Sequence, residues 1–125
     1  MKVMLVDDSR TMRNVQKNIL KQIGFDNILE ASDGIDALSK LKAEAADLIL
    51  LDWNMPNMDG LSFLQAYRAD DKSTPIIMVT TEAEKARVID AIKAGVNNYV
   101  VKPFTPDVLS ARIQETLSKA GVAVG

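Results

Sequence analysis

Short apolar runs alternate with helical patterns along this chain, and this alternation restricts the fold more than any other feature. The candidate strands are Lys2–Val6, Asn27–Glu30, Asp47–Leu51, Pro75–Val79 and Asn98–Val101. Three of them contain four consecutive apolar residues, which is typical of parallel strands covered on both faces. Five strands that alternate with five helices predict an α/β fold, a (βα)5 doubly wound sheet of five parallel strands with helices on both sides.

The starts and ends of the helices are indicated by capping residues. Ser9 is a suitable N-cap for the first helix, and Gly24 can end it. The stretch Thr-Glu-Ala-Glu at 81–84 has the pattern of a capping box for the fourth helix, which should end before Gly95. The pair Thr105–Pro106 gives the fifth helix the strongest start signal, an N-cap followed by proline at the first helical position.

Apolar spacing predicts which helix faces are buried. The inward residues predicted for the first two helices are Met12, Val15, Ile19, Ile23, Ile35, Leu38 and Leu41. In the fifth helix, Leu109, Ile113 and Leu117 recur every four residues and should face the sheet.

Composition excludes several classes of function. The chain has 125 residues with no cysteine and no histidine, which excludes thiol catalysis, disulfides, Ser-His-Asp triads and histidine metal sites. Any metal must be held by oxygen, which favours Mg²⁺, Mn²⁺ or Ca²⁺. The net charge of −2 gives no basic surface for nucleic acid, and the apolar runs are too short for a membrane span. We expect residues 1–125 to form one cytoplasmic domain that binds neither nucleic acid nor membrane and carries no effector domain.

Carboxylates follow two of the predicted strands. In a doubly wound sheet, ligands bind beyond the carboxyl ends of the strands, at the switch point of the strand order. Asp7 and Asp8 follow the first strand, and Asp52 follows the third. If these strands flank the switch point, the three carboxylates converge, and their mutual repulsion favours a cation such as Mg²⁺ among them. The alternative for Asp7 and Asp8 is a favourable interaction with the N-terminus of the first helix.

Thr80 and Lys102 end the fourth and fifth strands. A hydroxyl donor and an ammonium group are what a bound phosphoryl group needs on the side away from the metal. Taken singly, an ordinary strand-end threonine and a solvated lysine are the simpler interpretations. Together with the three aspartates, Thr80 and Lys102 make five residues at four strand ends whose side chains could bind a metal ion and a phosphoryl group. This combination favours phosphoryl chemistry.

In order along the chain, these residues resemble the receiver domain of two-component response regulators, and most closely its stand-alone chemotaxis members. The matching motifs are Val-Asp-Asp at 6–8, Thr-Met-Arg at 11–13, Asp-Gly at 33–34, Asp-Trp-Asn-Met-Pro-Asn-Met-Asp-Gly at 52–60, Met-Val-Thr at 78–80 and Tyr-Val-Val-Lys-Pro-Phe at 99–104. The resemblance covers nearly the whole chain. It implies a flavodoxin-like fold with strand order 2-1-3-4-5 and a cis peptide bond between Lys102 and Pro103.

The resemblance implies a phosphoacceptor switch and not an enzyme that turns over external substrates. Asp52 would accept a phosphoryl group from a histidine kinase, and Lys102 and Thr80 would contact its oxygens. The implied Mg²⁺ ligands are Asp8, Asp52, the backbone carbonyl of Asn54 and, through water, Asp7. Asn54 and Glu82 would tune hydrolysis of the aspartyl phosphate, although a loop amide and an acid in a first helical turn are simpler interpretations of these two residues.

The resemblance also implies a partner surface made by the fourth helix, the fifth strand and the fifth helix. Tyr99 would move inward as Thr80 shifts toward the phosphoryl group, whereas a half-buried strand aromatic is the simpler interpretation. The implied surface residues are Lys85, Val88, Ile92, Val96, Tyr99, Val101, Phe104 and Arg112, of which core packing also explains Ile92 and Val101. The implied partners are a chemotaxis-type histidine kinase, the flagellar motor switch protein and a phosphatase, with the chain itself a monomer. Glu84 departs from the lysine that is usual in the best-known chemotaxis regulators.

Three alternatives stay open. An aspartyl-phosphate hydrolase of the haloacid dehalogenase type would have Asp-x-Asp after its first strand, whereas Asp7 and Asp8 are adjacent. A flavodoxin-like flavin carrier would need a phosphate loop rich in hydroxyl groups and glycine after the first strand, and the purified protein would be coloured. A receiver fold without phosphorylation is disfavoured because every acceptor-site residue is present.

Overall fold

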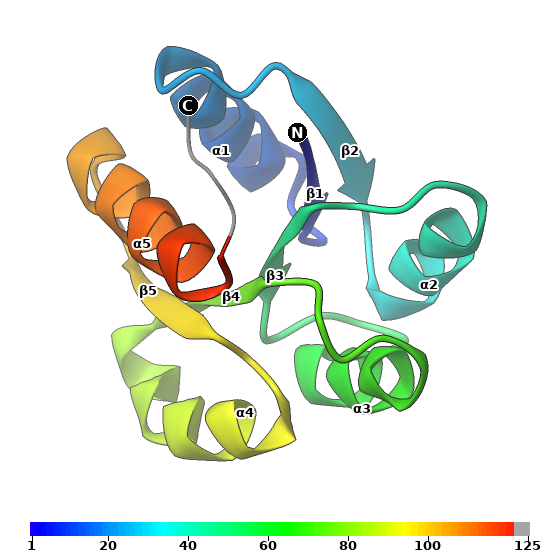
Figure 1. Cartoon of the computed structure of the whole chain (residues 1–125). Coiled ribbons are helices and arrows are strands. Elements are labelled where there is room, and N and C mark those ends of the chain that lie inside the picture. Colours follow the sequence, from blue (N-terminus) through cyan, green and yellow to red (C-terminus); the bar gives the residue numbers. More distant parts are fainter. Residues whose placement is uncertain (122–125) are drawn as a thin grey trace.

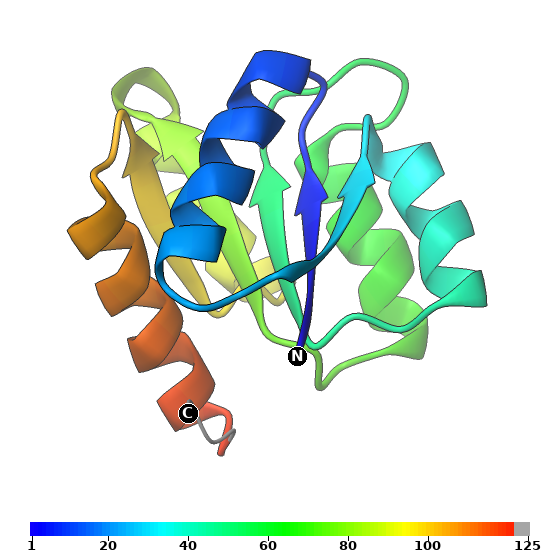
Figure 2. The same cartoon turned by 90° about the horizontal axis from the view of Figure 1, so that it is seen from above.

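The computed structural model describes residues 1–121, apart from the side chains of Glu82 and Ala83. Five parallel strands form one sheet in the order β2-β1-β3-β4-β5 (Figure 1 and Figure 2). The strands are β1 (Lys2–Val6), β2 (Asn27–Ala31), β3 (Leu48–Asp52), β4 (Ile76–Thr81) and β5 (Asn98–Lys102). The predicted fold class and strand order are confirmed.

Helices cover both faces of the sheet. They are α1 (Arg10–Gln22), α2 (Gly34–Ala43), α3 (Gly60–Asp70), α4 (Val88–Ala94) and α5 (Pro106–Lys119), with a 3₁₀ segment, η1 (Glu82–Arg87), before α4. Helices α1 and α5 lie on one face, and α2, α3 and α4 lie on the other (Figure 1). Each face therefore has its own apolar core, with Phe63 in one and Leu20 in the other. None of the helices within residues 1–121 has the length and apolar character needed to cross a bilayer.

The predicted caps of α1 and α5 are confirmed, but the capping box at 81–84 is wrong. Ser9 Oγ accepts a hydrogen bond from the Met12 N–H at 3.1 Å, and Thr105 Oγ1 accepts one from the Val108 N–H at 3.3 Å. The Thr81 hydroxyl instead donates to the Glu84 carboxylate at 3.0 Å and makes no cap hydrogen bond. Because the two side chains bind each other, the first helical N–H groups receive no side-chain cap from Thr81, and the chain first forms a 3₁₀ turn.

Two predicted buried positions are also wrong. Val15 of α1 and Ile35 of α2 are 45% and 54% exposed, whereas Gln16, Leu20 and Ala37 are buried. Four other predictions for these two helices agree with the structure, because Ile19 is buried and Ile23, Leu38 and Leu41 pack against the cores. The two errors therefore lie at single positions, where Gln16 and Ala37 are buried and the nearby larger apolar residues are exposed.

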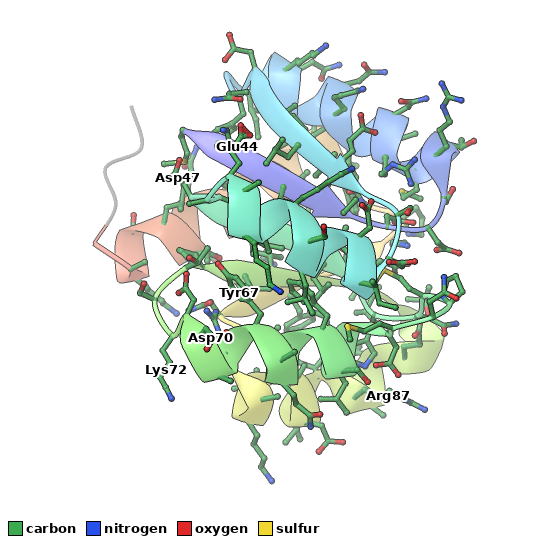
Figure 3. All side chains as sticks on the ribbon, turned by 90° about the vertical axis from the view of Figure 1, so that its right-hand side faces the viewer. Glu44, Asp47, Tyr67, Asp70, Lys72 and Arg87 are labelled. Carbon is green, nitrogen blue, oxygen red and sulfur yellow. The ribbon has the colours of Figure 1, made fainter. Side chains whose placement is uncertain are left out.

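The C-terminal end of α3, where Tyr67 and Asp70 lie in Figure 3, leads into a polar cluster centred on Asp71. The Asp71 carboxylate accepts hydrogen bonds from the Tyr67 hydroxyl at 2.9 Å and the Thr74 hydroxyl at 2.7 Å. The backbone N–H groups of Ser73 and Thr74 donate to its other oxygen at 2.9 and 3.0 Å. Partial burial raises the pKa of Asp71, but these hydrogen bonds outweigh that effect and hold the pKa well below its usual value.

Replacing Asp71 with Asn should lower the free energy of unfolding at neutral pH by about 1–2 kcal/mol, because hydrogen bonds to a charged acceptor are lost. A carboxylate with a lowered pKa stabilises the folded state above the unfolded pKa of about 3.9, and this contribution disappears as the pH falls through the lower folded value. Urea unfolding should therefore show a difference between wild type and Asp71→Asn that shrinks in acid. Asp70→Asn, at an exposed neighbouring position, is the control, and an equal loss in that variant would contradict the prediction.

Candidate functional site

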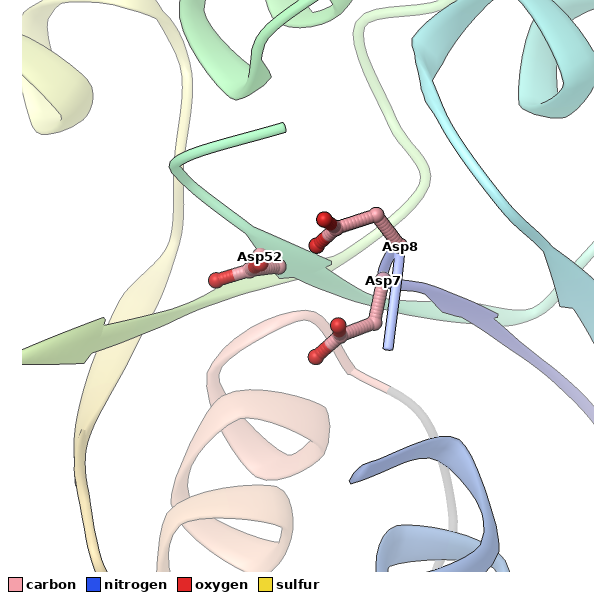
Figure 4. A group of neighbouring side chains, drawn as sticks. All are labelled: Asp7, Asp8 and Asp52. Carbon is pink, nitrogen blue, oxygen red and sulfur yellow. The ribbon is translucent and has the colours of Figure 1, made fainter. Parts of the chain in front are cut away.

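Three aspartates meet at the carboxyl ends of β1 and β3. Parallel pairing aligns Val6 with Leu51, which places the following residues, Asp7 and Asp52, side by side. One carboxylate oxygen each from Asp7, Asp8 and Asp52 lies within 4.8 Å of the others. The side chains of Asp7 and Asp8 point toward that of Asp52 (Figure 4). The predicted convergence of the three carboxylates is confirmed.

The carboxylates of Asp7 and Asp52 are removed from water, with residue exposures of 1% and 7%, whereas Asp8 is exposed. Asp7 Oδ1 accepts a hydrogen bond from the Ser9 N–H at 2.8 Å. Asp7 Oδ2 is buried and has no hydrogen-bond donor among the described residues. A buried carboxylate oxygen without a donor costs free energy, so this atom indicates a place for a cation.

Lys102 supplies one positive charge to the cluster. Its Nζ donates to Asp52 Oδ1 at 3.2 Å and lies 3.6 Å from Asp7 Oδ2. The lysine is the last residue of β5 and precedes a cis bond to Pro103, which confirms the implied cis bond. One ammonium group offsets only part of the charge of three carboxylates, so the site still favours a cation.

The acidic cluster changes the protonation of Asp52. Burial raises the pKa of Asp52 to about 6, and the negative charge of Asp7 acts in the same direction. The Lys102 ammonium opposes this rise. In the metal-free protein, Asp52 therefore changes its charge near pH 6, and a bound cation would favour the carboxylate form that can act as a nucleophile.

The first turn of α3 packs directly against the end of β3. The Gly60 N–H donates to the Trp53 carbonyl oxygen at 3.0 Å. A Cβ atom at position 60 would lie 2.7 Å from Trp53 Cε3 and 2.9 Å from the Asp52 carbonyl oxygen. Glycine is therefore required for this close approach, and Trp53 is held buried next to Asp52.

Thr80, which follows the residue paired with Asp52 on β4, and Asn54, two residues after Asp52, make no hydrogen bond to the carboxylates of the cluster. Thr80 is fully buried in β4, and its hydroxyl donates to the Thr81 carbonyl at 3.3 Å. Asn54 is an exposed loop residue two positions after Asp52. The side chain of Glu82 lies outside the described part of the chain. The roles implied for these three residues stay predictions.

The implied partner surface is only partly exposed in this conformation. Lys85 is exposed, whereas Tyr99, Val101, Phe104 and Arg112 are half-buried. Val88 and Val96 are only 8% and 5% exposed and belong to the core beneath α4, so they do not form an exposed surface here. The Arg112 guanidinium of α5 lies 5.8 Å from the centroid of the Tyr99 ring of β5, a cation–π contact between these two elements.

Three apolar residues on α4 and α5 are exposed although the sequence analysis does not predict their exposure. Ile92, for which core packing offered an explanation, is 54% exposed, which corrects that interpretation. Ile89 at 65% and Val108 at 43% were not singled out. Helical spacing alone could not give the exposure of Ile92, because it lies four residues after buried Val88, a spacing that usually places two side chains on one helix face.

Comparison with known proteins agrees with this geometry. Residues 3–114 match the family model described as the response regulator receiver domain. The chain is 52% identical over 120 residues to the chemotaxis protein CheY1 of Helicobacter pylori strain J99, which covers 94% of this chain and 97% of that protein. It is also 52% identical over 120 residues to the chemotaxis protein CheY homolog of Campylobacter jejuni, and that alignment covers 94% of this chain and 92% of the relative.

Solved structures show the same fold. Chemotaxis protein CheY4 of Vibrio cholerae aligns with a TM-score of 0.85 at 36% identity, covering 93% of this chain and 98% of that chain. The receiver domain of NtrX from Brucella abortus aligns with a TM-score of 0.87 at 25% identity, again covering 93% and 98%.

Proposed function

Because the chain belongs to the response regulator receiver domain family, we propose that it is a phosphoacceptor switch in chemotaxis. The family consists of regulators and not of enzymes that turn over external substrates. One observation carries the proposal: buried Asp52 at the end of β3 lies beside two further carboxylates and accepts a hydrogen bond from Lys102 at 3.2 Å.

Asp52 is the proposed nucleophile. One of its carboxylate oxygens attacks the phosphorus atom of a phosphohistidine, the phosphorus–nitrogen bond breaks, and its electron pair stays on the imidazole nitrogen. The product is an aspartyl phosphate. The chain contains no histidine, so the donor histidine belongs to a partner kinase.

Lys102 and Thr80 are the proposed contacts of the transferred group. Lys102 Nζ lies 3.2 Å from Asp52 Oδ1 and can offer its remaining protons to phosphoryl oxygens. The Thr80 hydroxyl, on the neighbouring strand β4, would exchange its bond to the Thr81 carbonyl for a phosphoryl oxygen. We assign the tuning of later hydrolysis to Asn54 and Glu82, by position only.

The residues at the cluster fit Mg²⁺. Receiver domains bind this ion in general, the ligands present are all oxygen atoms, and Asp7 Oδ2 is buried without a donor among the described residues. Asp8, Asp52, the Asn54 carbonyl and, through water, Asp7 would hold the ion. Bound there, Mg²⁺ would supply positive charge that neutralises phosphoryl oxygens during transfer.

The output surface is proposed to lie on α4, β5 and α5. Ile89 and Ile92 expose apolar side chains on α4, and Val108 does so on α5. Ile89 and Ile92 lie three residues apart on α4 and so are neighbours on its surface, and neighbouring exposed apolar side chains can mark a protein contact. Tyr99, whose ring Arg112 contacts, would move inward on phosphorylation. The proposed partners are a chemotaxis-type histidine kinase, the flagellar motor switch protein and a phosphatase. The protein would act in the cytoplasm as a monomer.

Incubation with a small acyl phosphate and Mg²⁺ tests the proposal. The intact mass should rise by one phosphoryl group, about 80 Da, and EDTA should prevent the change. The phosphorylated protein should then bind the flagellar motor switch protein more tightly than the unmodified protein in a fluorescence-anisotropy titration. An unchanged mass in the presence of Mg²⁺ would contradict the phosphoacceptor function, and equal affinity of both forms would contradict the choice of partner.

A further inference from the structure

Arg13 joins the acidic cluster to the helix and strand behind it. From α1, its Nη1 donates to the Asp7 carbonyl oxygen at 2.6 Å, and its Nε donates to Glu30 Oε1 on β2 at 3.2 Å. We propose that Arg13 is a positioning residue of the magnesium site, which fixes the peptide unit between Asp7 and Asp8 and thereby sets the affinity for Mg²⁺. The inference rests on the proposed function, because it assigns a role within the same site.

The backbone is bound on both sides of Asp7. The Asp7 N–H donates to the Ala31 carbonyl oxygen on β2 at 3.0 Å, and the Asp7 carbonyl accepts from Arg13. A peptide unit is planar, so the direction of the Asp7 carbonyl also sets the position of the Asp8 Cα atom. Asp8 is exposed, so packing contributes little to holding it. The Arg13 hydrogen bond therefore orients the start of the Asp8 side chain from one side, and the Ser9 N–H, which donates to Asp7 Oδ1, constrains the backbone on the other.

The orientation of Arg13 is itself fixed by Glu30. The Glu30 carboxylate accepts hydrogen bonds on both oxygens, from Arg13 Nε at 3.2 Å and from Lys17 Nζ at 3.0 Å. The Arg13 side chain is 15% exposed, whereas that of Lys17 is 30% exposed. A guanidinium has donors in a rigid fork and can reach two acceptors on different elements, whereas an ammonium is a single point of charge. Lys17 thus shares the carboxylate but makes no hydrogen bond to the Asp7 backbone.

Removal of Arg13 has two opposing consequences for Mg²⁺. A positive charge beside three carboxylates repels the ion, so its loss alone should strengthen binding. Loss of the hydrogen bond to the Asp7 carbonyl should weaken binding, because the carboxylates are no longer held toward one position. Groups that orient metal ligands typically change affinity by about 10-fold to 100-fold. The sign of the change therefore separates a positioning role from a purely electrostatic one.

A Mg²⁺ titration of the metal-free protein, without any phosphoryl donor, provides the test. Trp53 is the only tryptophan and follows Asp52 directly, so its fluorescence should report binding. We expect Arg13→Met to weaken Mg²⁺ binding by about 10-fold or more. Lys17→Met also removes one positive charge that is paired with Glu30, but it leaves the Asp7 carbonyl bond in place. It should therefore change the affinity for Mg²⁺ by less than about twofold. Arg13→Lys keeps the charge but has one donor group, and its affinity should be intermediate.

The outcomes separate this inference from the proposed function. Equal or tighter Mg²⁺ binding by folded Arg13→Met overturns the positioning role and leaves the phosphoacceptor function intact. A wild-type protein without a saturable Mg²⁺ response contradicts the proposed function and the inference together. If Arg13→Met shows no cooperative thermal transition, Glu30→Gln decides instead, since it removes the charge that orients Arg13. Weakened binding in that variant supports the positioning role, and unchanged binding overturns it.

Discussion

Asp52→Asn should show no added mass after incubation with a small acyl phosphate and Mg²⁺, whereas the wild type should gain about 80 Da. The amide has nearly the shape of the carboxylate but lacks its nucleophilic oxygen, so no acyl phosphate can form at this position. Asp59→Asn, in the same β3–α3 segment, should still gain the phosphoryl group. A full mass increase in Asp52→Asn would place the acceptor on another residue and would contradict the assignment.

The same substitution should alter stability in the absence of metal. A carboxyl group with a raised pKa stabilises the folded state most below the unfolded pKa of about 3.9, and this contribution is lost as the pH rises through the folded value. For Asp52 the folded value is about 6. The wild-type protein in EDTA should therefore lose stability between about pH 4 and pH 6, and at neutral pH Asp52→Asn should be more stable by about 1–3 kcal/mol.

Urea unfolding of both proteins across this pH range measures the effect. Asp26→Asn, at an exposed position in the loop between α1 and β2, is the control and should keep the wild-type pH dependence. A wild-type protein whose stability does not fall between about pH 4 and pH 6 relative to Asp52→Asn would contradict the raised pKa.

The sheet and the acidic cluster could be predicted from the sequence because they depend on short, strongly patterned segments. Apolar runs at 3–6, 48–51 and 76–79 mark strands that are buried on both faces. Strand boundaries then differ by at most two residues from those predicted. Asp7 and Asp52 follow or end such strands, and the strand order that the receiver-domain resemblance implies pairs these strands and brings the two residues together.

Details that depend on packing between elements could not be predicted in the same way. The side of α1 that meets the sheet includes Gln16, a polar residue that apolar spacing does not select. Before α4 the chain forms a 3₁₀ turn in which Thr81 bonds to the Glu84 side chain and makes no cap hydrogen bond. The sequence motif at 11–13 includes Arg13, but only the folded backbone brings its guanidinium to the Asp7 carbonyl. Side-chain contacts of this kind have no signature in residue spacing.

Asp8→Ala should weaken Mg²⁺ binding by at least about 100-fold, which corresponds to about 2.7 kcal/mol. Carboxylates supply most of the attraction in an oxygen-ligand site, and Asp8 is the proposed carboxylate ligand that is exposed to water. Its removal therefore leaves no buried cavity, and the fold should persist. The charge of Asp8 also contributes to the raised pKa of Asp52, after burial and the charge of Asp7.

Two measurements on metal-free Asp8→Ala check this account together. The Trp53 titration should require a much higher Mg²⁺ concentration than in the wild type, and the thermal midpoint in EDTA should rise because one repulsive charge is gone. If Asp8 served only to stabilise the N-terminus of α1, the opposite result would be expected, because loss of its negative charge would lower the thermal midpoint. An unchanged Mg²⁺ titration argues against Asp8 as a ligand, and a lower midpoint argues that its charge serves α1 and not the metal site.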